Sequence, residues 1–486
     1  MTRPRRARII CTLGPATRSQ GMLERLIGAG MDVARLNMAY GTQEDHRDHI
    51  RALRAGSLKL GQPVAVLLDL QGIKIRIGQV KGESLHLESG RDINLRPGRR
   101  PSTADCLYVS YPALLRDVRV GHRVLLDDGL LCLVVTGREG NALTARVKEG
   151  GVLISRKGVN LPYSAVSARP FTSKDRGDLA FGIREGVDAV ALSFVTRPGD
   201  VDLVRRELRR MGSHIPVIAK IEKPSAVSMI EDILDRADGI MVARGDLAVE
   251  SSPFTVPLTQ KLLIREANRK QRLVITATQM LDSMRYNPVP TRAETADVAN
   301  AILDGSDAVM LSGETSVGKD PVRAVRMMAR IVTETEQGGA SFRVGLPTPE
   351  PVREGDLDRT GFAVADAAVS AARDVGARCI VAFTRSGYTA AVLAKFRPPM
   401  PIVAFTSEPT IIRRMKLLWG VVPLPMDHLE DTDTMVTRVE KALLEGGYAR
   451  RGDDVVITAS LPMGTRGKTN FLKVHRMAGR PAPGRR

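Results

Sequence analysis

Eight short apolar runs, each followed by a helical pattern, constrain the fold of this chain most strongly. Uninterrupted apolar runs are typical of parallel strands covered on both faces, because strands with one face in water alternate instead. Eight strand–helix units favour a closed (β/α)8 TIM barrel over the alternative, an open doubly wound sheet. The runs are RIICTLG, DVARLNM, VAVLLDLQ, DAVALSFV, PVIAKIE, GIMVARGD, LVITATQ and DAVMLSGE.

Two other regions depart from this pattern. Between the third and fourth runs, short alternating segments broken by Gly, Asn and Asp predict an inserted all-β lid domain over 79–158. We therefore expect the barrel to comprise 1–78 and 159–338. After a Gly- and Pro-rich linker, four helix–strand units predict a C-terminal α/β regulatory domain over 355–486. A chain of 486 residues is long enough for three such domains.

The composition argues against several classes of protein. No apolar run reaches the roughly 20 residues of a membrane helix, and the N-terminus lacks the apolar stretch of a signal peptide. Three of the four cysteines lie in apolar runs, which indicates reduced thiols in a cytoplasmic protein rather than a disulfide or zinc framework. The net charge of +18 comes from dispersed arginines with few aromatic residues, so we expect no nucleic-acid partner and no membrane partner.

Charged residues end two successive runs: Lys220 and Glu222 end the fifth, and Arg244 and Asp246 end the sixth. Strand residues two apart share a face, so Lys220 and Glu222 should point the same way. A lysine beside two carboxylates suits Mg²⁺ and a phosphorylated ligand. A structural ion pair is the alternative for any one residue, but buried charge is costly unless it is paired or binds a ligand.

Catalytic residues of a barrel lie at the carboxyl ends of its strands. Two cations there, Arg35 and Lys220, cap no helix and together suit a phosphate. Ser193 and Ser312 are as well explained as helix caps or core hydrogen-bond partners. The remaining polar residues at these ends are Asn37, Asp69, Thr278, Gln279 and Glu314.

The fifth and sixth runs extend into the longer motifs VIAKIEKP and MVARGDLAVE, and the eighth ends the motif NPVPTRAETADVANAILDGSDAVMLSGET. With several other motifs, they resemble the pyruvate kinase family from about Arg8 to Met477. The resemblance implies Mg²⁺-dependent transfer of a phosphoryl group from phosphoenolpyruvate to ADP, giving pyruvate and ATP in glycolysis, with Mn²⁺ as an alternative ion. It also implies a homotetramer and a phosphorylated allosteric effector. The motifs include RIICTLGPAT, DVARLN, SRKGVNLP, VIAKIEKP, MVARGDLAVE, ITATQMLDSM and NPVPTRAETADVANAILDGSDAVMLSGET.

The resemblance also implies roles for individual residues. Lys220 and Arg35 stabilise the transferring phosphoryl group, and Glu222 and Asp246 bind Mg²⁺. Thr278 holds the substrate carboxylate and lies on the proton path. Other implied substrate contacts are Ser193 and the backbone of Gly245, and implied nucleotide contacts are Asn37, Tyr40, Arg76 and Lys157.

The chain departs from the family in the region that binds a monovalent cation. Asn37 and Asp69 remain there, but Ala39 replaces a serine ligand of potassium, and Lys74 stands where potassium-requiring relatives have glutamate. Because the Lys74 ammonium would supply the ion's charge and repel it, we expect activity without K⁺. Alternatively, Lys74 points into solvent and a water replaces the lost hydroxyl. Tyr40 also replaces a histidine on the nucleotide side.

A loop in the C-terminal domain resembles the family's effector-phosphate loop and opens a helix, which suits an anion. Simple capping by Ser386 is an equally good explanation. Tyr388 stands where some members have arginine, so the effector's identity stays open, and 464–470 resembles the loop that faces it. The effector-loop residues are Thr384, Arg385, Ser386, Gly387 and Thr389.

Two other function classes remain as alternatives. A catalytically weakened paralogue would bind phosphometabolites and regulate a partner, and the intact Lys220, Glu222 and Asp246 argue against it. A basic nucleic-acid-binding protein is disfavoured because the arginines are dispersed.

Overall fold

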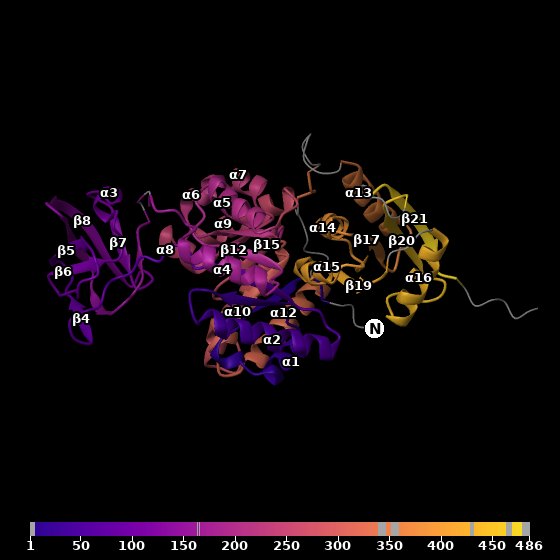
Figure 1. The fold of residues 1–486 in the computed structure, drawn as a ribbon, viewed down its shortest axis with the longest axis horizontal. Coiled ribbons are helices and arrows are strands. Elements are labelled where there is room, and N and C mark those ends of the chain that lie inside the picture. Colours follow the sequence, from indigo (N-terminus) through magenta and orange to yellow (C-terminus); the bar gives the residue numbers. More distant parts are fainter. Residues whose placement is uncertain are drawn as a thin grey trace, which may run out of the picture.

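The computed structural model describes residues 5–162, 164, 166–338, 347–350, 359–427, 432–462 and 469–478. Figure 1 shows the all-β insert at one end of the molecule, the barrel in the middle and the C-terminal domain at the other end. None of the helices in these ranges is long and apolar enough to cross a membrane.

Eight parallel strands close into a barrel in the described part of the chain, which confirms the predicted TIM barrel. Every residue of these strands is buried except Asn37, which is half-buried, and this explains why the runs are continuously apolar. Around the barrel the strands are β1 (Arg8–Thr12), β16 (Ala308–Leu311), β15 (Leu273–Ala277), β14 (Gly239–Ala243), β13 (Val217–Ile221), β12 (Ala189–Leu192), β3 (Ala65–Asp69) and β2 (Val33–Asn37).

Helices follow the strands and cover the barrel. The segment between β13 and β14 forms two helices instead of the single helix its amphipathic pattern predicts, because Met229 leaves the helical conformation between them. Asp246 lies in the first turn of a helix rather than at a strand end. The helices are α1 (Gln20–Ala29), α2 (Gln43–Leu60), α4 (Ser173–Arg184), α5 (Pro198–Arg210), α6 (Pro224–Ser228), α7 (Ile230–Arg236), α8 (Arg244–Glu250), α9 (Val256–Arg269), α10 (Arg292–Leu303), α11 (Gly313–Ser316) and α12 (Pro321–Gly338).

The insert is built from β-strands around its own apolar core, as its alternating pattern predicts. Its described strands form a six-stranded sheet in the order β11-β7-β8-β9-β5-β6 and a two-stranded sheet of β10 and β4. The elements are β4 (Ser84–Leu87), β5 (Asp92–Pro97), β6 (Cys106–Val109), α3 (Leu114–Asp117), β7 (Arg123–Leu126), β8 (Leu131–Glu139), β9 (Ala142–Glu149), β10 (Gly151–Ile154) and β11 (Val159–Asn160).

The C-terminal domain carries a five-stranded sheet in its described part, one strand more than the sequence predicts. The extra strand, β21, pairs antiparallel with β20 at the sheet edge and has no buried residue, so it lacks the apolar run that reveals the others. The elements are α13 (Arg359–Asp374), β17 (Ile380–Phe383), α14 (Tyr388–Lys395), β18 (Ile402–Thr406), α15 (Pro409–Arg414), β19 (Val421–Pro425), α16 (Thr432–Glu445), β20 (Asp454–Ala459) and β21 (Phe471–Arg476).

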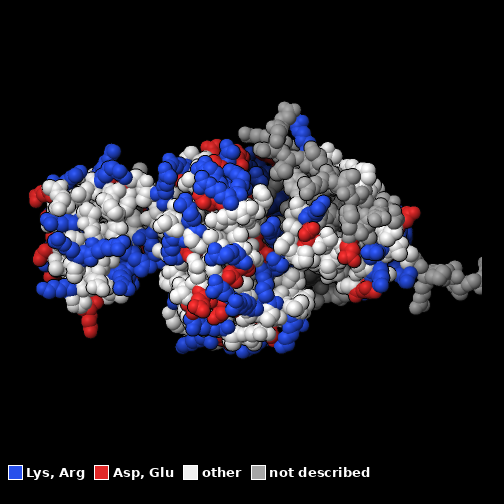
Figure 2. All heavy atoms as spheres, in the orientation of Figure 1, with Lys and Arg blue, Asp and Glu red and all other residues white. Residues whose placement is uncertain are grey.

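The surface and the cysteines agree with the expectations from composition. Figure 2 shows Lys and Arg spread over the insert and the barrel and interspersed with acidic residues. All four cysteines are free thiols, and Cys11, Cys132 and Cys379 are buried.

Candidate functional site

Lys220 is the centre of a charged cluster at the carboxyl ends of the barrel strands. It lies on β13 with 9% of its surface exposed, and its Nζ donates a 2.7 Å hydrogen bond to Ser193 Oγ. The same ammonium lies 2.9 Å from Glu222 Oε1 and 3.3 Å from Asp69 Oδ1. The barrel therefore brings together four residues that the sequence places on three separate strand ends.

Arg35 joins this cluster through Asp69. Its Nε lies 2.7 Å from Asp69 Oδ2, and its Nη1 donates to Thr12 Oγ1 at 2.9 Å. Asp69 thus bridges the two cations and fixes their separation. Ser193 also donates to Leu70 O at 2.8 Å, so it supports the strand end as well as accepting from the lysine.

The electrostatics keep Lys220 charged. Burial alone would lower the pKa of Lys220, but the attraction of Asp69 and Glu222 outweighs burial and raises it above the usual value. Burial alone would raise the pKa of Asp69, but Lys220 and Arg35 hold it below its usual value. A permanent positive charge therefore lies at the barrel mouth.

Glu222 and Asp246 form the carboxylate side of the site. Burial raises the pKa of Glu222 to about 7, with Asp246 adding to the rise and Lys220 opposing it. Burial also raises the pKa of Asp246. A buried and a half-buried carboxylate with raised pKa values suit a cation, which would remove the cost of their negative charge. The described residues contain no group of three or more metal-ligating side chains, so an ion here would keep positions for water or substrate oxygens.

Thr278 and Gly245 meet beside this cluster. Thr278 Oγ1 accepts from Gly245 N at 2.8 Å and donates to Ala277 O at 2.6 Å. Thr278 has φ +70°, which is strained for a β-branched residue, and Gln279 follows with φ +52°. Backbone strain of this kind is characteristic of functional sites and needs support from surrounding structure.

Arg244 supplies that support, a role the sequence did not reveal. Its guanidinium turns away from Lys220 and donates to Thr278 O at 2.7 Å, while its Nη1 lies 2.7 Å from Asp297 Oδ2. The strand-end arginine thus holds the strained threonine instead of joining the charged cluster.

Ser312 Oγ is buried with no hydrogen-bond partner among the described atoms, and Glu314 accepts from Ser312 N at 2.7 Å.

On the outer side of the site, Lys74 lies over the Tyr40 ring with its Nζ 4.8 Å from the ring centroid. Burial lowers the pKa of Lys74, with further lowering by Arg76, and Asp246 opposes it. Lys74 is half-buried and lines the same cavity as Asp246. Asn37 Oδ1 accepts from Ala39 N at 3.1 Å, so this oxygen already has a donor.

The lid meets the barrel near the same mouth, around a cavity of about 120 Å³ lined by Lys74 and Asp246 among others. Lys157 Nζ lies 2.7 Å from Asp127 Oδ1 within the lid. Glu250 was assigned no role from the sequence although it ends a conspicuous motif. It accepts from Asn160 of the lid at 2.9 Å and pairs with Lys223 at 3.1 Å.

The predicted effector loop lies in the C-terminal domain, away from the cluster around Lys220. Thr384 Oγ1 accepts from Gly387 N at 2.9 Å, and Ser386 Oγ accepts from Tyr388 N at 3.4 Å, so both side chains bind backbone N–H groups at the start of α14. Thr389 Oγ1 lies 2.6 Å from Thr469 Oγ1, and both side chains are buried. Arg385 and Ser386 are exposed. Of the predicted facing loop, 464–468 lie outside the described residues.

The chain is similar in sequence and in fold to known proteins. A family model described as "Pyruvate kinase, barrel domain" matches residues 4–325, and one described as "Pyruvate kinase, alpha/beta domain" matches 362–475. A pyruvate kinase from Mycobacterium intracellulare is 45% identical over 477 residues, covering 97% of this chain and 98% of the relative. One from Geobacillus stearothermophilus is 44% identical, covering 97% of this chain and 80% of the relative.

Among solved structures, a pyruvate kinase from Cryptosporidium parvum is similar with a TM-score of 0.89 and 33% sequence identity. The similarity covers 97% of this chain and 96% of that chain.

Proposed function

The chain belongs to the pyruvate kinase family, and we propose that the cluster around Lys220 carries out the reaction of that family, phosphoryl transfer from phosphoenolpyruvate to ADP. The observation that carries this proposal is the buried Lys220 that lies between Asp69 and Glu222 at the barrel mouth. Phosphoryl transfer is mostly positioning and neutralisation of charge, and this cluster is built for both.

Lys220 and Arg35 neutralise the phosphoryl group as it moves. Asp69 holds the two cations at a fixed spacing, so little reorganisation is needed when charge develops on the phosphoryl oxygens. Ser193 keeps the lysine ammonium oriented through its 2.7 Å contact.

Glu222 and Asp246 hold the divalent ion, Mg²⁺ or alternatively Mn²⁺. Their raised pKa values support this assignment, because a cation would compensate the negative charge of both carboxylates. When bound, the ion supplies positive charge to oxygens of the substrate. The carboxylates set its position and leave its other coordination sites free.

The backbone of Gly245 and the hydroxyl of Thr278 hold the substrate carboxylate. Thr278 also lies on the path by which the enolate product receives its proton to become pyruvate. The strained φ of Thr278, held by Arg244, supports a role that requires this hydroxyl in one position.

Nucleotide binding is assigned to the outer side of the site and to the lid. Tyr40, Arg76 and Lys157 meet the phosphates and the body of ADP, with Asn37 at the base of the loop that carries Tyr40. The 2.7 Å ion pair with Asp127 orients Lys157 within the lid, and a phosphate would compete with Asp127 for its ammonium. A lid that closes over the mouth would keep water from the phosphoryl group.

We also infer that the reaction does not need K⁺. The oxygens of Asp69 already face Arg35 and Lys220, the oxygen of Asn37 accepts from Ala39 N, and Lys74 brings an ammonium to the site. A monovalent cation would find its ligands engaged and a positive charge beside it.

Several further properties are proposed on the family's pattern. They are domain bounds of 1–78 with 159–338, 79–158 and 355–486, a homotetrameric assembly, a cytoplasmic location, a place in glycolysis, and allosteric control by a phosphorylated effector at Thr384–Thr389. The buried Thr389–Thr469 contact supports the effector loop, since it ties the loop to the residues that follow 464–468.

The direct test is a coupled assay of pyruvate formation by the purified full chain. Turnover should require phosphoenolpyruvate, ADP and a divalent ion together. Binding of phosphoenolpyruvate without any formation of pyruvate or ATP would instead indicate a protein that only senses the metabolite.

A further inference from the structure

Four aspartates form a ring at the amino ends of alternate barrel strands, on the face opposite the charged cluster. Each precedes its strand directly and accepts a backbone N–H from the neighbouring strand at 3.1, 2.8, 2.8 and 2.8 Å in chain order. They are Asp32 before β2, Asp188 before β12, Asp238 before β14 and Asp307 before β16.

Cations from the C-terminal domain occupy three positions of this ring. Lys416 Nζ lies 2.8 Å from Asp32, Arg413 Nε lies 2.9 Å from Asp188, and Lys395 Nζ lies 2.5 Å from Asp307. Asp238 differs from the other three, because it pairs with a residue of the barrel itself. Its Oδ2 lies 2.9 Å from Nη2 of Arg205 on helix α5. The C-terminal domain thus docks on three of the four positions.

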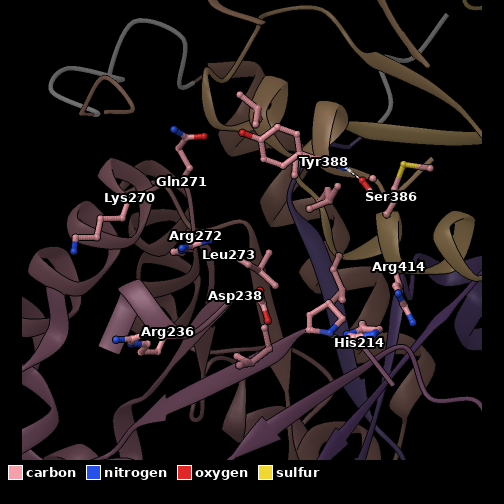
Figure 3. A pocket seen from close by; sticks show the side chains of 18 of the residues that line it. His214, Arg236, Asp238, Lys270, Gln271, Arg272, Leu273, Ser386, Tyr388 and Arg414 are labelled. Atoms are coloured by element: carbon pink, nitrogen blue, oxygen red, sulfur yellow. Dashed lines mark hydrogen bonds between the residues drawn. The ribbon is translucent and has the colours of Figure 1, made fainter. Parts of the chain in front are cut away.

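A cavity of about 700 Å³ lies at the fourth position, between the two domains. Figure 3 shows its walls, with barrel side chains on one side and side chains of the C-terminal domain on the other. Its volume is that of a small-molecule site. The labelled barrel residues are His214, Arg236, Asp238, Lys270, Gln271, Arg272 and Leu273, and those of the C-terminal domain are Ser386, Tyr388 and Arg414.

The charges that line the cavity do not balance. Every acidic side chain in its wall has a cation partner: Asp235 with Lys270 at 2.5 Å, Asp238 with Arg205 at 2.9 Å and Glu350 with Arg269 at 2.6 Å. Three arginines in the wall form no ion pair with the described residues, although Arg236 is exposed, Arg272 Nε donates to Leu234 O at 2.9 Å and Asp188 attracts Arg414. Arg414 Nε is buried without a hydrogen-bond acceptor in the described part of the chain. An anion bound in the cavity would accept a hydrogen bond from Arg414 Nε and balance the positive charge of the wall.

The other part of the wall is apolar. Most of the apolar side chains in the wall are buried, and the rest lie beside the buried ones. A ligand with an apolar body would cover this surface, whereas a purely polar ligand would not. They are Ile218, Leu273, Ala391, Val392, Met415, Leu417 and Leu418.

We propose that this cavity binds an organic phosphate whose body is apolar, with Arg414 holding the phosphate and the aliphatic wall covering the body. The site is separate from the substrate site, since it lies at the amino ends of the strands rather than the carboxyl ends. Because both domains contribute walls, an occupant contacts the barrel and the C-terminal domain at once. The cavity also reaches Ser386 and Gly387, so its occupant lies against the proposed effector loop.

The test uses 1-naphthyl phosphate as the probe and equilibrium dialysis against the full chain, with saturating phosphoenolpyruvate and no ADP so that the barrel mouth is filled. Arg414→Gln should weaken binding by about tenfold or more, because a charged hydrogen bond is lost. Ala391→Phe should weaken it by filling the space without changing a charge. Arg209→Gln, on the exposed face of α5, is the matched control and should bind as the parent does.

Competitors distinguish this site from the others. Inorganic phosphate, which lacks an apolar body, should displace the probe only weakly, and a sugar phosphate that activates the parent should not displace it. Equal affinity in the parent, Arg414→Gln and Ala391→Phe would overturn the proposal. So would stronger binding when phosphoenolpyruvate is left out, because the probe would then occupy the barrel mouth, or displacement by the activating sugar phosphate, because the probe would then occupy the effector loop.

Discussion

Lys395 Nζ lies 2.5 Å from Asp307 Oδ2, so a lysine of the C-terminal domain is buried against a carboxylate at the amino end of the last barrel strand. Both side chains are almost fully buried, and Arg397 contributes a second cation 2.8 Å from Asp307. Burial alone would raise the pKa of Asp307, but Arg397 and Lys395 outweigh it and hold the pKa below its usual value. The pair joins the two domains.

Replacing Lys395 with Met should therefore loosen the domain contact. Removal of one partner leaves a buried carboxylate less compensated, which costs on the order of 3 kcal/mol. Trp419, the single tryptophan, is buried in the apolar cluster of the barrel, so its fluorescence reports on docking. The urea transition followed by Trp419 should move to lower urea. Lys441→Met, at an exposed helical pair, is the control, and an equal shift in both variants would contradict the role of Lys395.

Lys220→Met should nearly abolish turnover. The lost ammonium is aimed at charge that develops during transfer, and one such group contributes roughly 3 kcal/mol or more, a factor of about a hundred. Binding of phosphoenolpyruvate should fall much less than kcat. Steady-state kinetics with direct binding measurements check this, with the exposed Lys59→Met as control. Near-normal kcat would remove Lys220 from the mechanism.

Glu222→Gln should raise the divalent-ion requirement. The variant loses one of two protein carboxylates at the proposed ion, so the half-saturating Mg²⁺ concentration should rise by about tenfold or more. Activity titrations with Mg²⁺ and with Mn²⁺ measure this, and the exposed Glu231→Gln serves as control. An unchanged metal titration with lower activity would show that Glu222 does not bind the ion.

Activity should be insensitive to potassium. Added K⁺ should change turnover by less than about twofold at constant ionic strength, since Lys74 already places a cation at the site. Lys74→Glu should lower activity in K⁺-free buffer and make it respond to K⁺. A large stimulation of the parent enzyme that is specific to K⁺ would contradict this prediction.

The effector loop can be tested by replacing Thr384 and Ser386 with Ala together. Thr384 caps Gly387 N and Ser386 is exposed beside it, so the loop should lose both its shape and a phosphate donor. The ratio of activity with and without a sugar phosphate that activates the parent should fall to about one. Ser370→Ala, on the exposed face of α13, is the control. Full retention of activation would place the effector elsewhere.

The sequence alone determined the features that depend on neighbours along the chain. Strand burial makes continuous apolar runs, and the Thr172–Asp175 and Thr291–Glu294 capping boxes begin α4 and α10 as their spacing predicts. The strand ends of a barrel converge, so Lys220 and Glu222 at the end of the fifth run and Asp246 at the end of the sixth could be identified from two successive runs.

Only the tertiary structure decided what depends on residues far apart in the chain. Asp307 and Lys395 are 88 positions apart, and nothing in either segment indicates the other. The direction of the Arg244 side chain depends on the strained Thr278 it supports, and β21 is held by edge pairing without an apolar run. The cavity above Asp238 exists because the C-terminal domain docks on three aspartates and spans the fourth. Such features arise from the packing of separate elements, and packing has no signal in local sequence.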